Sequence, residues 1–296
     1  MTGLNGWLVV DKPVGPTSAQ VVGKLKWALR KGGHGKVKIG HGGTLDPLAS
    51  GVLPIALGEA TKLSGYLLNG PKAYRFAIRF GEATSTDDAE GEVVASSDVR
   101  PSPAEIDAVL PRFTGAIRQR PPAYSALKVE GERAYALARA GETVELAERE
   151  LTIHSLTLVE ADAESATLEV HCSKGTYVRS LARDIALALG TVGHVSLLRR
   201  TAAGPFTLDQ AVSLDKCVEL VHGPAPEQAL LPLTAGLDDI PVLPVDPQEA
   251  VALKQGRRIL RPREKPGHYI ATDGPVPVAL VEVFQDDVKV VRGFNL

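Results

Sequence analysis

One aspartate, Asp46, stands out as the residue most able to do chemistry. It lies in a glycine-rich stretch, residues 39–51, which reads Ile-Gly-His-Gly-Gly-Thr-Leu-Asp-Pro-Leu-Ala-Ser-Gly and is expected to be an ordered loop. A carboxylate among apolar residues needs either a cationic partner or a raised pKa. The candidates are His41 in the same stretch, and Arg179 and Arg183 near the start of a later helix. Aspartate before proline also starts many turns, so this pattern alone leaves a catalytic and a structural role open.

Two tyrosines and an arginine could complete a site around Asp46. Tyr74 falls on the same side of an expected strand as three core residues. Tyr177 and Arg179 follow the turn at residues 173–176, where the backbone N–H groups of a helix start suit an anion. Each of these residues also has an ordinary structural explanation, as a packing residue or as part of a solvated helix start.

Several classes of chemistry lack their sequence motifs. There is no His-Glu-x-x-His and no carboxylate cluster for a hard cation, so we expect no metal. There is no Gly-x-Ser-x-Gly elbow, which disfavours an acyl hydrolase. The glycine motifs that bind nucleotide phosphates are also missing, so we expect no cofactor.

The charge of the chain is unevenly distributed. The net charge is −2, yet residues 1–80 hold eleven lysines and arginines against three acidic residues. This asymmetry favours one positive face for a polyanion such as nucleic acid. The two cysteines, Cys172 and Cys217, have no zinc-site spacing and are expected to be free thiols. The sequence shows no signal peptide and no apolar run long enough to cross a membrane, so we expect a cytoplasmic protein without membrane contact.

Strands and helices are interspersed along the chain without strict alternation. Alternating or apolar runs predict strands at residues 6–10, 52–57, 72–80, 151–160, 166–172, 195–201, 278–284 and 288–294. Helical spacing of apolar residues predicts helices from about residue 18 to 31 and at 59–68, 103–113 and 177–189. Residues 222–247 contain six prolines and are expected to be a linker. The pattern favours an α+β fold, with a mixed or antiparallel central β-sheet and flanking helices, over a doubly wound parallel sheet.

Six motifs in a fixed order resemble those of the bacterial TruB-type tRNA pseudouridine synthases. They lie at residues 6–18, 40–51, 72–76, 120–131, 173–184 and 194–201. The second motif, Gly-His-Gly-Gly-Thr-Leu-Asp-Pro-Leu-Ala-Ser-Gly, is similar to the catalytic motif of that family. Gly42 and Ser50 stand where the family is expected to have threonine. Neither difference affects Asp46, so they put in doubt only the details of this loop.

The resemblance implies a fold, a substrate and a reaction. It implies a pseudouridine synthase catalytic domain at residues 1–240 and a small β-rich PUA-like RNA-binding module at 241–296. The implied partner is the T-arm of tRNA, in which uridine 55 of the T-loop is isomerised to pseudouridine. The enzyme must flip this base out of its stack, and we expect it to act as a monomer.

The resemblance also assigns roles to individual residues. Asp46 is the expected nucleophile and Arg179 its ion-pair partner, while Tyr74 stacks on the flipped base and assists deprotonation. His41 fills the space that the base vacates, and Tyr177 and Leu198 line the pocket. The expected phosphate contacts of the RNA are Lys12, Lys36, Lys38 and Lys62.

Three other functions stay open on the sequence. A non-catalytic tRNA-binding or tRNA-folding protein would share the basic face but would not need Asp46. A nucleoside N-glycosidase or hydrolase would use Asp46 on a sugar and release free uracil. A sister pseudouridine synthase would act on another RNA.

Overall fold

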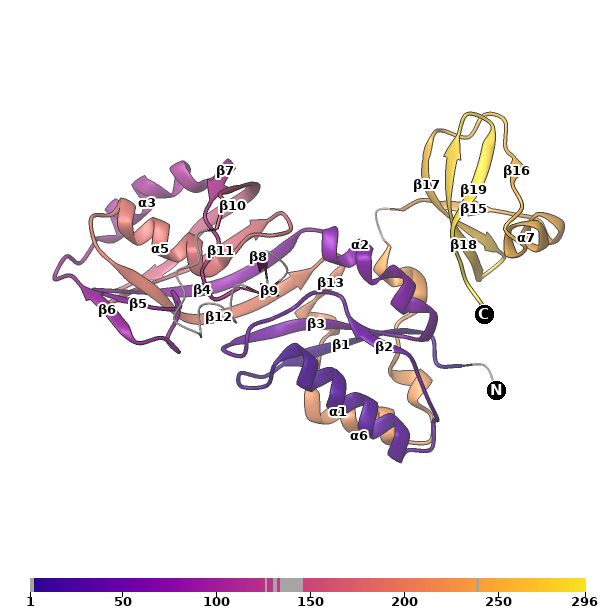
Figure 1. Cartoon of the computed structure of the whole chain (residues 1–296), viewed down its shortest axis with the longest axis horizontal. Helices are drawn as coiled ribbons and strands as arrows, with labels where there is room; N and C mark the ends of the chain where they lie inside the picture. Colours follow the sequence, from indigo (N-terminus) through magenta and orange to yellow (C-terminus); the bar gives the residue numbers. More distant parts are fainter. Residues whose placement is uncertain (1–2, 126, 130–131, 134–145, 238–239) are drawn as a thin grey trace. The chain divides into compact units, whose positions relative to one another are not determined.

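The computed structural model describes residues 3–125, 127–129, 132–133, 146–237 and 240–296. The chain forms two compact units. The first unit contains residues 1–45, 52–68 and 204–296, and the second contains residues 46–51 and 69–203. Figure 1 labels their helices and strands.

The second unit is built on a mainly antiparallel sheet. Its strand order is β12-β4-β11-β10-β7, and each neighbouring pair is antiparallel. The bounds are β4 Lys72–Phe80, β7 Gly115–Gln119, β10 Arg149–Ala161, β11 Ser165–Cys172 and β12 Gly193–Ala203. The first residues of β3 (Ala49–Leu57) run parallel to β12, with Ala49 opposite Leu198. The sheet is therefore mixed, as expected from the sequence.

Helices and short hairpins complete the second unit. Helix α5 (Val178–Ala188) packs on β12 and β4, and α3 (Pro103–Val109) continues into the 3-10 turn η2 (Leu110–Phe113) and packs on β10. Hairpins are formed by β5 (Glu82–Thr84) with β6 (Val93–Ser96), and by β8 (Lys128–Val129) with β9 (Glu132–Arg133). In β4, Phe76, Ile78 and Phe80 are buried while Arg75 and Arg79 are exposed, which confirms the alternation predicted there.

The first unit places a helix pair beside short strands. Helix α1 (Ser18–Lys31) begins with a capping box between Thr17 and Gln20 and packs against α6 (Leu214–His222). Strand β1 (Gly6–Lys12) lies between β14 (Val212–Ser213) and β3, and β2 (Ile39–His41) is antiparallel to the far part of β3. The remaining short elements are η1 (Gly58–Leu63), α2 (Ser64–Asn69), β13 (Phe206–Thr207), η3 (Leu208–Gln210), η4 (Pro226–Ala229) and η5 (Leu233–Gly236).

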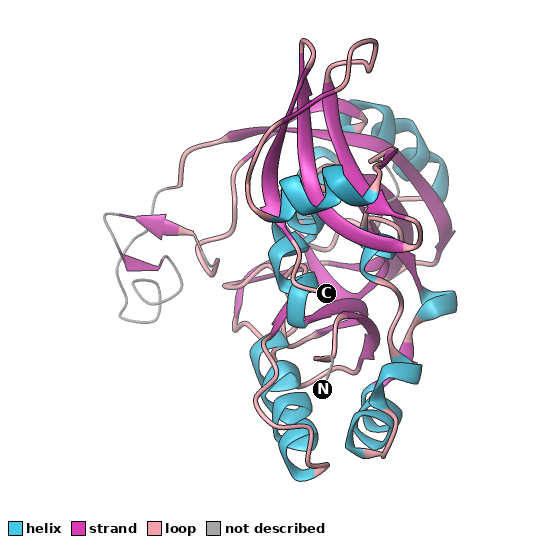
Figure 2. Cartoon of the chain, turned by 90° about the vertical axis from the view of Figure 1, so that its right-hand side faces the viewer, coloured by secondary structure: helices cyan, strands magenta, loops and turns pink. Residues whose placement is uncertain are grey.

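The C-terminal residues of the first unit form a second sheet. Its strand order is β15-β17-β18-β19-β16, and α7 (Pro247–Lys254) packs against β17, β18 and β19 (Figures 1 and 2). The strands are β15 Val242–Pro244, β16 Ile259–Leu260, β17 Gly267–Asp273, β18 Val276–Phe284 and β19 Asp287–Gly293. Its core contains Leu253, Ala271 and Val281. The β-rich C-terminal part is confirmed, while the domain boundary at 240/241 stays a prediction.

Three expectations about elements need correction. Residues 222–247 are not a free linker, because Leu231 exchanges two backbone hydrogen bonds with Trp7, at 2.9 and 2.8 Å, and the Trp7 indole donates to the Leu233 carbonyl. The stretch 59–68 is a 3-10 turn followed by a short α-helix instead of one helix. The loop expected at residues 39–51 is extended at both ends, where β2 and the start of β3 form ladders.

Candidate active site

Asp46 and Arg179 form an ion pair in the second unit. The Asp46 Oδ2 atom lies 3.0 Å from Nη2 of Arg179. Asp46 lies in the loop that leads into β3, and its side chain keeps 39% of its surface exposed, whereas the Arg179 side chain keeps 7%. Of the three cationic partners that the sequence offered for Asp46, the structure therefore selects Arg179. The carboxylate stays open to a ligand while its partner is buried.

The protein holds the Arg179 guanidinium from several directions. Nη1 lies 3.2 Å from Oδ2 of Asp88 and donates to the Thr86 carbonyl at 2.9 Å. Nη2 donates to the Tyr124 carbonyl at 3.0 Å. A planar guanidinium with this many fixed partners has little freedom to turn, so it holds the Asp46 carboxylate in one place.

Asp88 is a site residue that sequence reasoning missed. It is only 2% exposed, and its carboxylate accepts hydrogen bonds from the Thr86 hydroxyl and from the Glu90 backbone N–H. It lies between the strand predicted at residues 72–80 and the helix predicted at 103–113, where the sequence predicts no element. The neighbouring Asp87 has φ +60, a left-handed conformation that aspartate tolerates better than most residues.

Arg183, the other helical candidate, has different partners. Its guanidinium lies 2.9 Å from both Asp87 and Asp184 and donates to the Arg120 carbonyl at 3.1 Å. Burial raises the pKa of the Asp87 carboxyl, and the Arg183 charge opposes that rise. Arg183 therefore stabilises the loop beside the site and does not pair with Asp46.

Tyr74 and Tyr177 both lie within the electrostatic influence of Asp46. Burial raises the pKa of the Tyr74 phenol; the charge of Arg200 and its hydrogen bond to Tyr74 oppose the rise, and Asp46 adds to it. Burial also raises the pKa of Tyr177, with the neighbouring Ser125 hydroxyl acting against it. Both phenols are therefore protonated at neutral pH.

The backbone fixes where these side chains stand. Tyr177 is the N-cap residue of α5, and the Gln119 amide both accepts from its N–H (2.9 Å) and donates to its carbonyl (3.1 Å). Leu198 is buried on β12, opposite Ala49 on one side and Phe76 on the other. The loop before β3, strand β4 and the start of α5 thus bring together Asp46, Tyr74, Tyr177 and Arg179. Leu198 lies opposite Ala49, three residues after Asp46.

The remaining predicted site residues lie in the first unit. His41 is half-buried on β2, where its Nδ1 accepts a weak hydrogen bond from the Gly43 N–H. Lys36 and Lys38 are exposed in the loop after α1. Lys12 is fully buried and donates to the carbonyls of Pro13 and Pro16, so a phosphate contact there has no support.

Lys62, the last predicted RNA contact, is engaged within the protein. Its ammonium donates to Glu59 at 2.6 Å and to the Gly293 carbonyl at 2.7 Å. These bonds tie η1 to the end of β19 and leave 28% of the side chain exposed. An RNA contact at Lys62 stays a prediction, and RNA would have to compete with these partners.

The described residues hold no group of three or more metal-ligating side chains. Among the same residues, no helix is long and apolar enough to cross a membrane.

Comparison with known proteins identifies similar chains along the whole length. Residues 30–178 match the model of the TruB family pseudouridylate synthase N-terminal domain, and residues 179–238 match that of the tRNA pseudouridylate synthase B C-terminal domain. The tRNA pseudouridine synthase B of Novosphingobium aromaticivorans is 57% identical and covers 99% of this chain and 98% of its own length. That of Zymomonas mobilis is 53% identical, with 99% and 96% covered.

Solved structures show the same fold. A chain in a crystal structure of a Cbf5-Nop10-Gar1 complex is 27% identical with a TM-score of 0.76, and the match covers 98% of this chain and 85% of that one. A chain of an H/ACA RNP bound to a substrate RNA containing 2'-deoxyuridine has the same TM-score at 24% identity.

Proposed function

We propose, from the premise that this chain belongs to the TruB family of pseudouridylate synthases, that it isomerises uridine 55 in the T-loop of tRNA to pseudouridine. The family supplies the reaction class, that of an isomerase acting on RNA. The single observation that carries the proposal is the half-open Asp46 carboxylate, 3.0 Å from a buried Arg179. Such a carboxylate is accessible to a ligand and is held in one direction by its partner.

The reaction conserves every atom of the substrate. The enzyme first flips the uridine out of its stack and into the pocket. The Asp46 carboxylate then attacks the sugar or the uracil ring, and the bond between N1 and the sugar C1′ breaks. The uracil turns and rejoins C1′ through its C5 atom. The proton on C5 finally leaves, N1 takes up a proton, and Asp46 is released unchanged.

Arg179 and the residues around the base have distinct tasks in this scheme. Arg179 holds the Asp46 carboxylate aimed at the reacting carbon. The ring of Tyr74 stacks on the flipped base, and its phenol assists removal of the C5 proton. Tyr177 and Leu198 form the walls of the pocket, and His41 fills the space that the base leaves in the RNA.

Contacts outside the pocket hold the tRNA. Lys36 and Lys38 are exposed and free to meet phosphates, and the β-rich residues 241–296 act as a PUA-like RNA-binding module. The T-arm of tRNA is the partner, and the enzyme works as a monomer in the cytoplasm, where its substrate is found.

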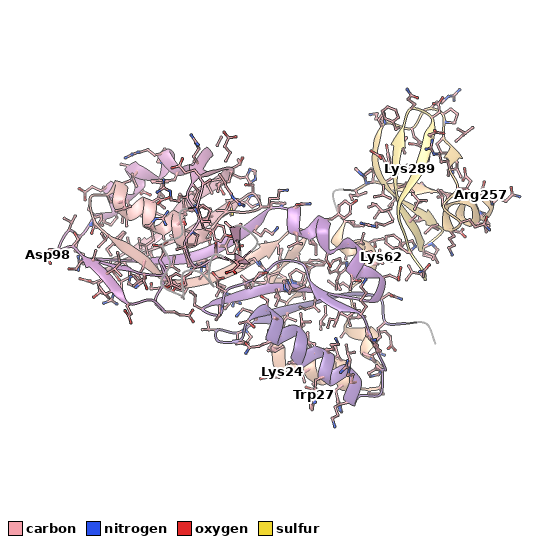
Figure 3. All side chains as sticks on the ribbon, in the orientation of Figure 1. Lys24, Trp27, Lys62, Asp98, Arg257 and Lys289 are labelled. Atoms are coloured by element: carbon pink, nitrogen blue, oxygen red, sulfur yellow. The ribbon has the colours of Figure 1, made fainter. Side chains whose placement is uncertain are left out.

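Tritium release tests both the reaction and the nucleophile. Unmodified tRNA tritiated at uridine C5 is incubated with the wild type and with Asp46→Asn, and the modified site is mapped. We expect release from one T-loop uridine by the wild type and none by Asp46→Asn, which should still bind tRNA. Asp98→Asn is the matched control, because Asp98 is an exposed aspartate of the second unit (Figure 3).

The other outcomes identify the alternatives. Free uracil in the products would indicate a glycosidase, and turnover by Asp46→Asn would refute the nucleophile. Tight tRNA binding without tritium release from the wild type would favour a tRNA-binding or tRNA-folding protein. Release from a different RNA would indicate a sister synthase.

A further inference from the structure

Helix α1 presents a basic face with an exposed tryptophan, and the proposed reaction uses none of it. The inner face of the helix is apolar and buried, with Val21, Leu25 and Ala28 packed inside the first unit. The outer face carries Trp27, whose side chain is 57% exposed, whereas the other tryptophan, Trp7, is fully buried. Figure 3 shows Lys24 and Trp27 on α1.

Cations surround Trp27 on this outer face. Lys24, Arg30 and Lys31 are three or four residues away, and side chains at these spacings are neighbours on a helix surface. Lys24 pairs with Asp215 at 2.8 Å. Lys26, Arg30 and Lys31 are exposed, and no carboxylate among the described residues lies within ion-pair distance of them. Between Lys12 and Leu45 the sequence contains no acidic residue at all.

A glycine lies one turn before the tryptophan. Gly23 is in the middle of α1, where glycine is less favourable than alanine. A Cβ atom built on Gly23 would have nothing within 4 Å, so packing does not require glycine there. Gly23 is itself exposed, so the outer face is open to solvent one turn before Trp27 as well.

We infer that Lys26, Trp27, Arg30 and Lys31 form an RNA-binding surface, here named the α1 surface. Its cations bind backbone phosphates, and Trp27 stacks on an unpaired base. The inference rests on the proposed function, which supplies RNA as the ligand. An anionic membrane is a weaker candidate, because a membrane-binding helix inserts its apolar face and the apolar face of α1 is already buried.

Binding measurements on full-length variants test the surface. The dissociation constant of unmodified tRNA is measured against salt concentration for wild type, Trp27→Ala and the triple variant Lys26→Gln/Arg30→Gln/Lys31→Gln. Each lost phosphate contact lowers the slope of log Kd against log salt by about 1, so the triple variant should lose up to about 3. Trp27→Ala should bind about tenfold more weakly. Lys216→Gln is the control, because this exposed lysine is already paired with Glu219 at 2.7 Å.

Fluorescence reports on Trp27 directly. The chain has two tryptophans and Trp7 is buried, so a collisional quencher reaches Trp27 alone. Acrylamide is the suitable quencher, because it is neutral and RNA does not repel it. Saturating tRNA should protect the wild-type fluorescence from acrylamide.

The outcomes separate this inference from the proposed function. Wild-type affinity and salt slope in both variants, with Trp27 still quenched in the complex, would overturn the α1 surface even if the wild type forms pseudouridine. Absence of pseudouridine would overturn the proposed function, while the binding comparison would still decide the surface. Binding to phosphatidylglycerol vesicles that the variants lose, with unchanged tRNA affinity, would assign the surface to a membrane and overturn the inference.

Discussion

At the scale of single residues, the site depends on one guanidinium that serves two carboxylates. Arg179 lies 3.0 Å from the half-open Asp46 and 3.2 Å from the buried Asp88. The two acids have different surroundings, and this sets their tasks. Asp88 is enclosed and hydrogen-bonded, so it cannot reach a substrate. We conclude that it orients Arg179, while Asp46 is available to react.

The substitution Asp88→Asn tests that division. The substitution removes the negative charge that lies beside Arg179. It leaves the hydrogen bonds from Arg179 to the carbonyls of Thr86 and Tyr124. A small displacement of a catalytic group costs about 100-fold in rate, so we expect a loss of that order in single-turnover pseudouridine formation. The affinity for tRNA should hold, because Asp88 is buried. A wild-type rate would show that Arg179 needs no second carboxylate, and Asp98→Asn controls for the loss of a charge.

At the scale of elements, Gly51 sets where the Asp46 loop joins the sheet. Gly51 has φ +102 and pairs with Arg200 across β3 and β12. A Cβ atom at this position would overlap the Arg200 carbonyl oxygen. The strand therefore begins close to β12 only because this residue is glycine, and Asp46 stands five residues before it.

We expect Gly51→Ala to weaken both fold and activity. Alanine is strained at this φ and meets a backbone atom, so the free energy of unfolding should fall by more than about 1 kcal/mol. Chemical denaturation and tritium release measure the two effects. Gly40→Ala is the control in the same glycine-rich stretch, because its built Cβ has nothing within 4 Å. Equal stability of the two variants would contradict this reading of Gly51.

Elements defined by local patterns were predictable, and those defined by distant partners were not. The apolar spacing of α1 and the alternation of β4 depend on neighbouring residues, and both were confirmed. The proline-rich stretch 222–247 looked like a linker because its pairing with Trp7 joins residues far apart in sequence. In the site, the residue types alone left three candidate partners for Asp46. The role of Asp88 could not be predicted, because its position depends on the conformation of a turn.

At the scale of the whole molecule, net charge concealed the distribution that matters. The net charge of −2 would argue against a polyanionic ligand. The first unit nevertheless carries a basic segment without acidic residues between Lys12 and Leu45. The structure divides these cations by burial. Lys12 donates hydrogen bonds to loop carbonyls, whereas the cations of the α1 surface are exposed to solvent. The uneven distribution of charge is visible in the sequence. Only the structure separates the lysines that are bonded within the protein from those that are exposed and available to RNA.

Global stability should depend on pH through Lys72. This lysine is 7% exposed, and burial together with the charge of Arg200 lowers its pKa from 10.5 to about 8. The folded protein therefore releases this proton near pH 8 and the unfolded chain only near 10.5. Between these values the unfolded chain binds more protons, so the stability contributed by Lys72 rises with pH. Below pH 8 Lys72 is protonated in both the folded and the unfolded state. Its buried charge then lowers the free energy of unfolding by a constant amount.

Lys72→Met should remove that penalty. At pH 7 we expect the variant to be more stable than the wild type, and the wild type should regain about 1 kcal/mol relative to it between pH 7 and pH 9. Denaturant unfolding of both proteins at pH 7, 8 and 9 measures this difference. Burial raises the pKa of Cys172 to about 11 and of Cys217 to about 12, which lowers the stability of both proteins as the pH approaches and passes 9. A constant difference across this range would show that Lys72 keeps its proton in the folded state.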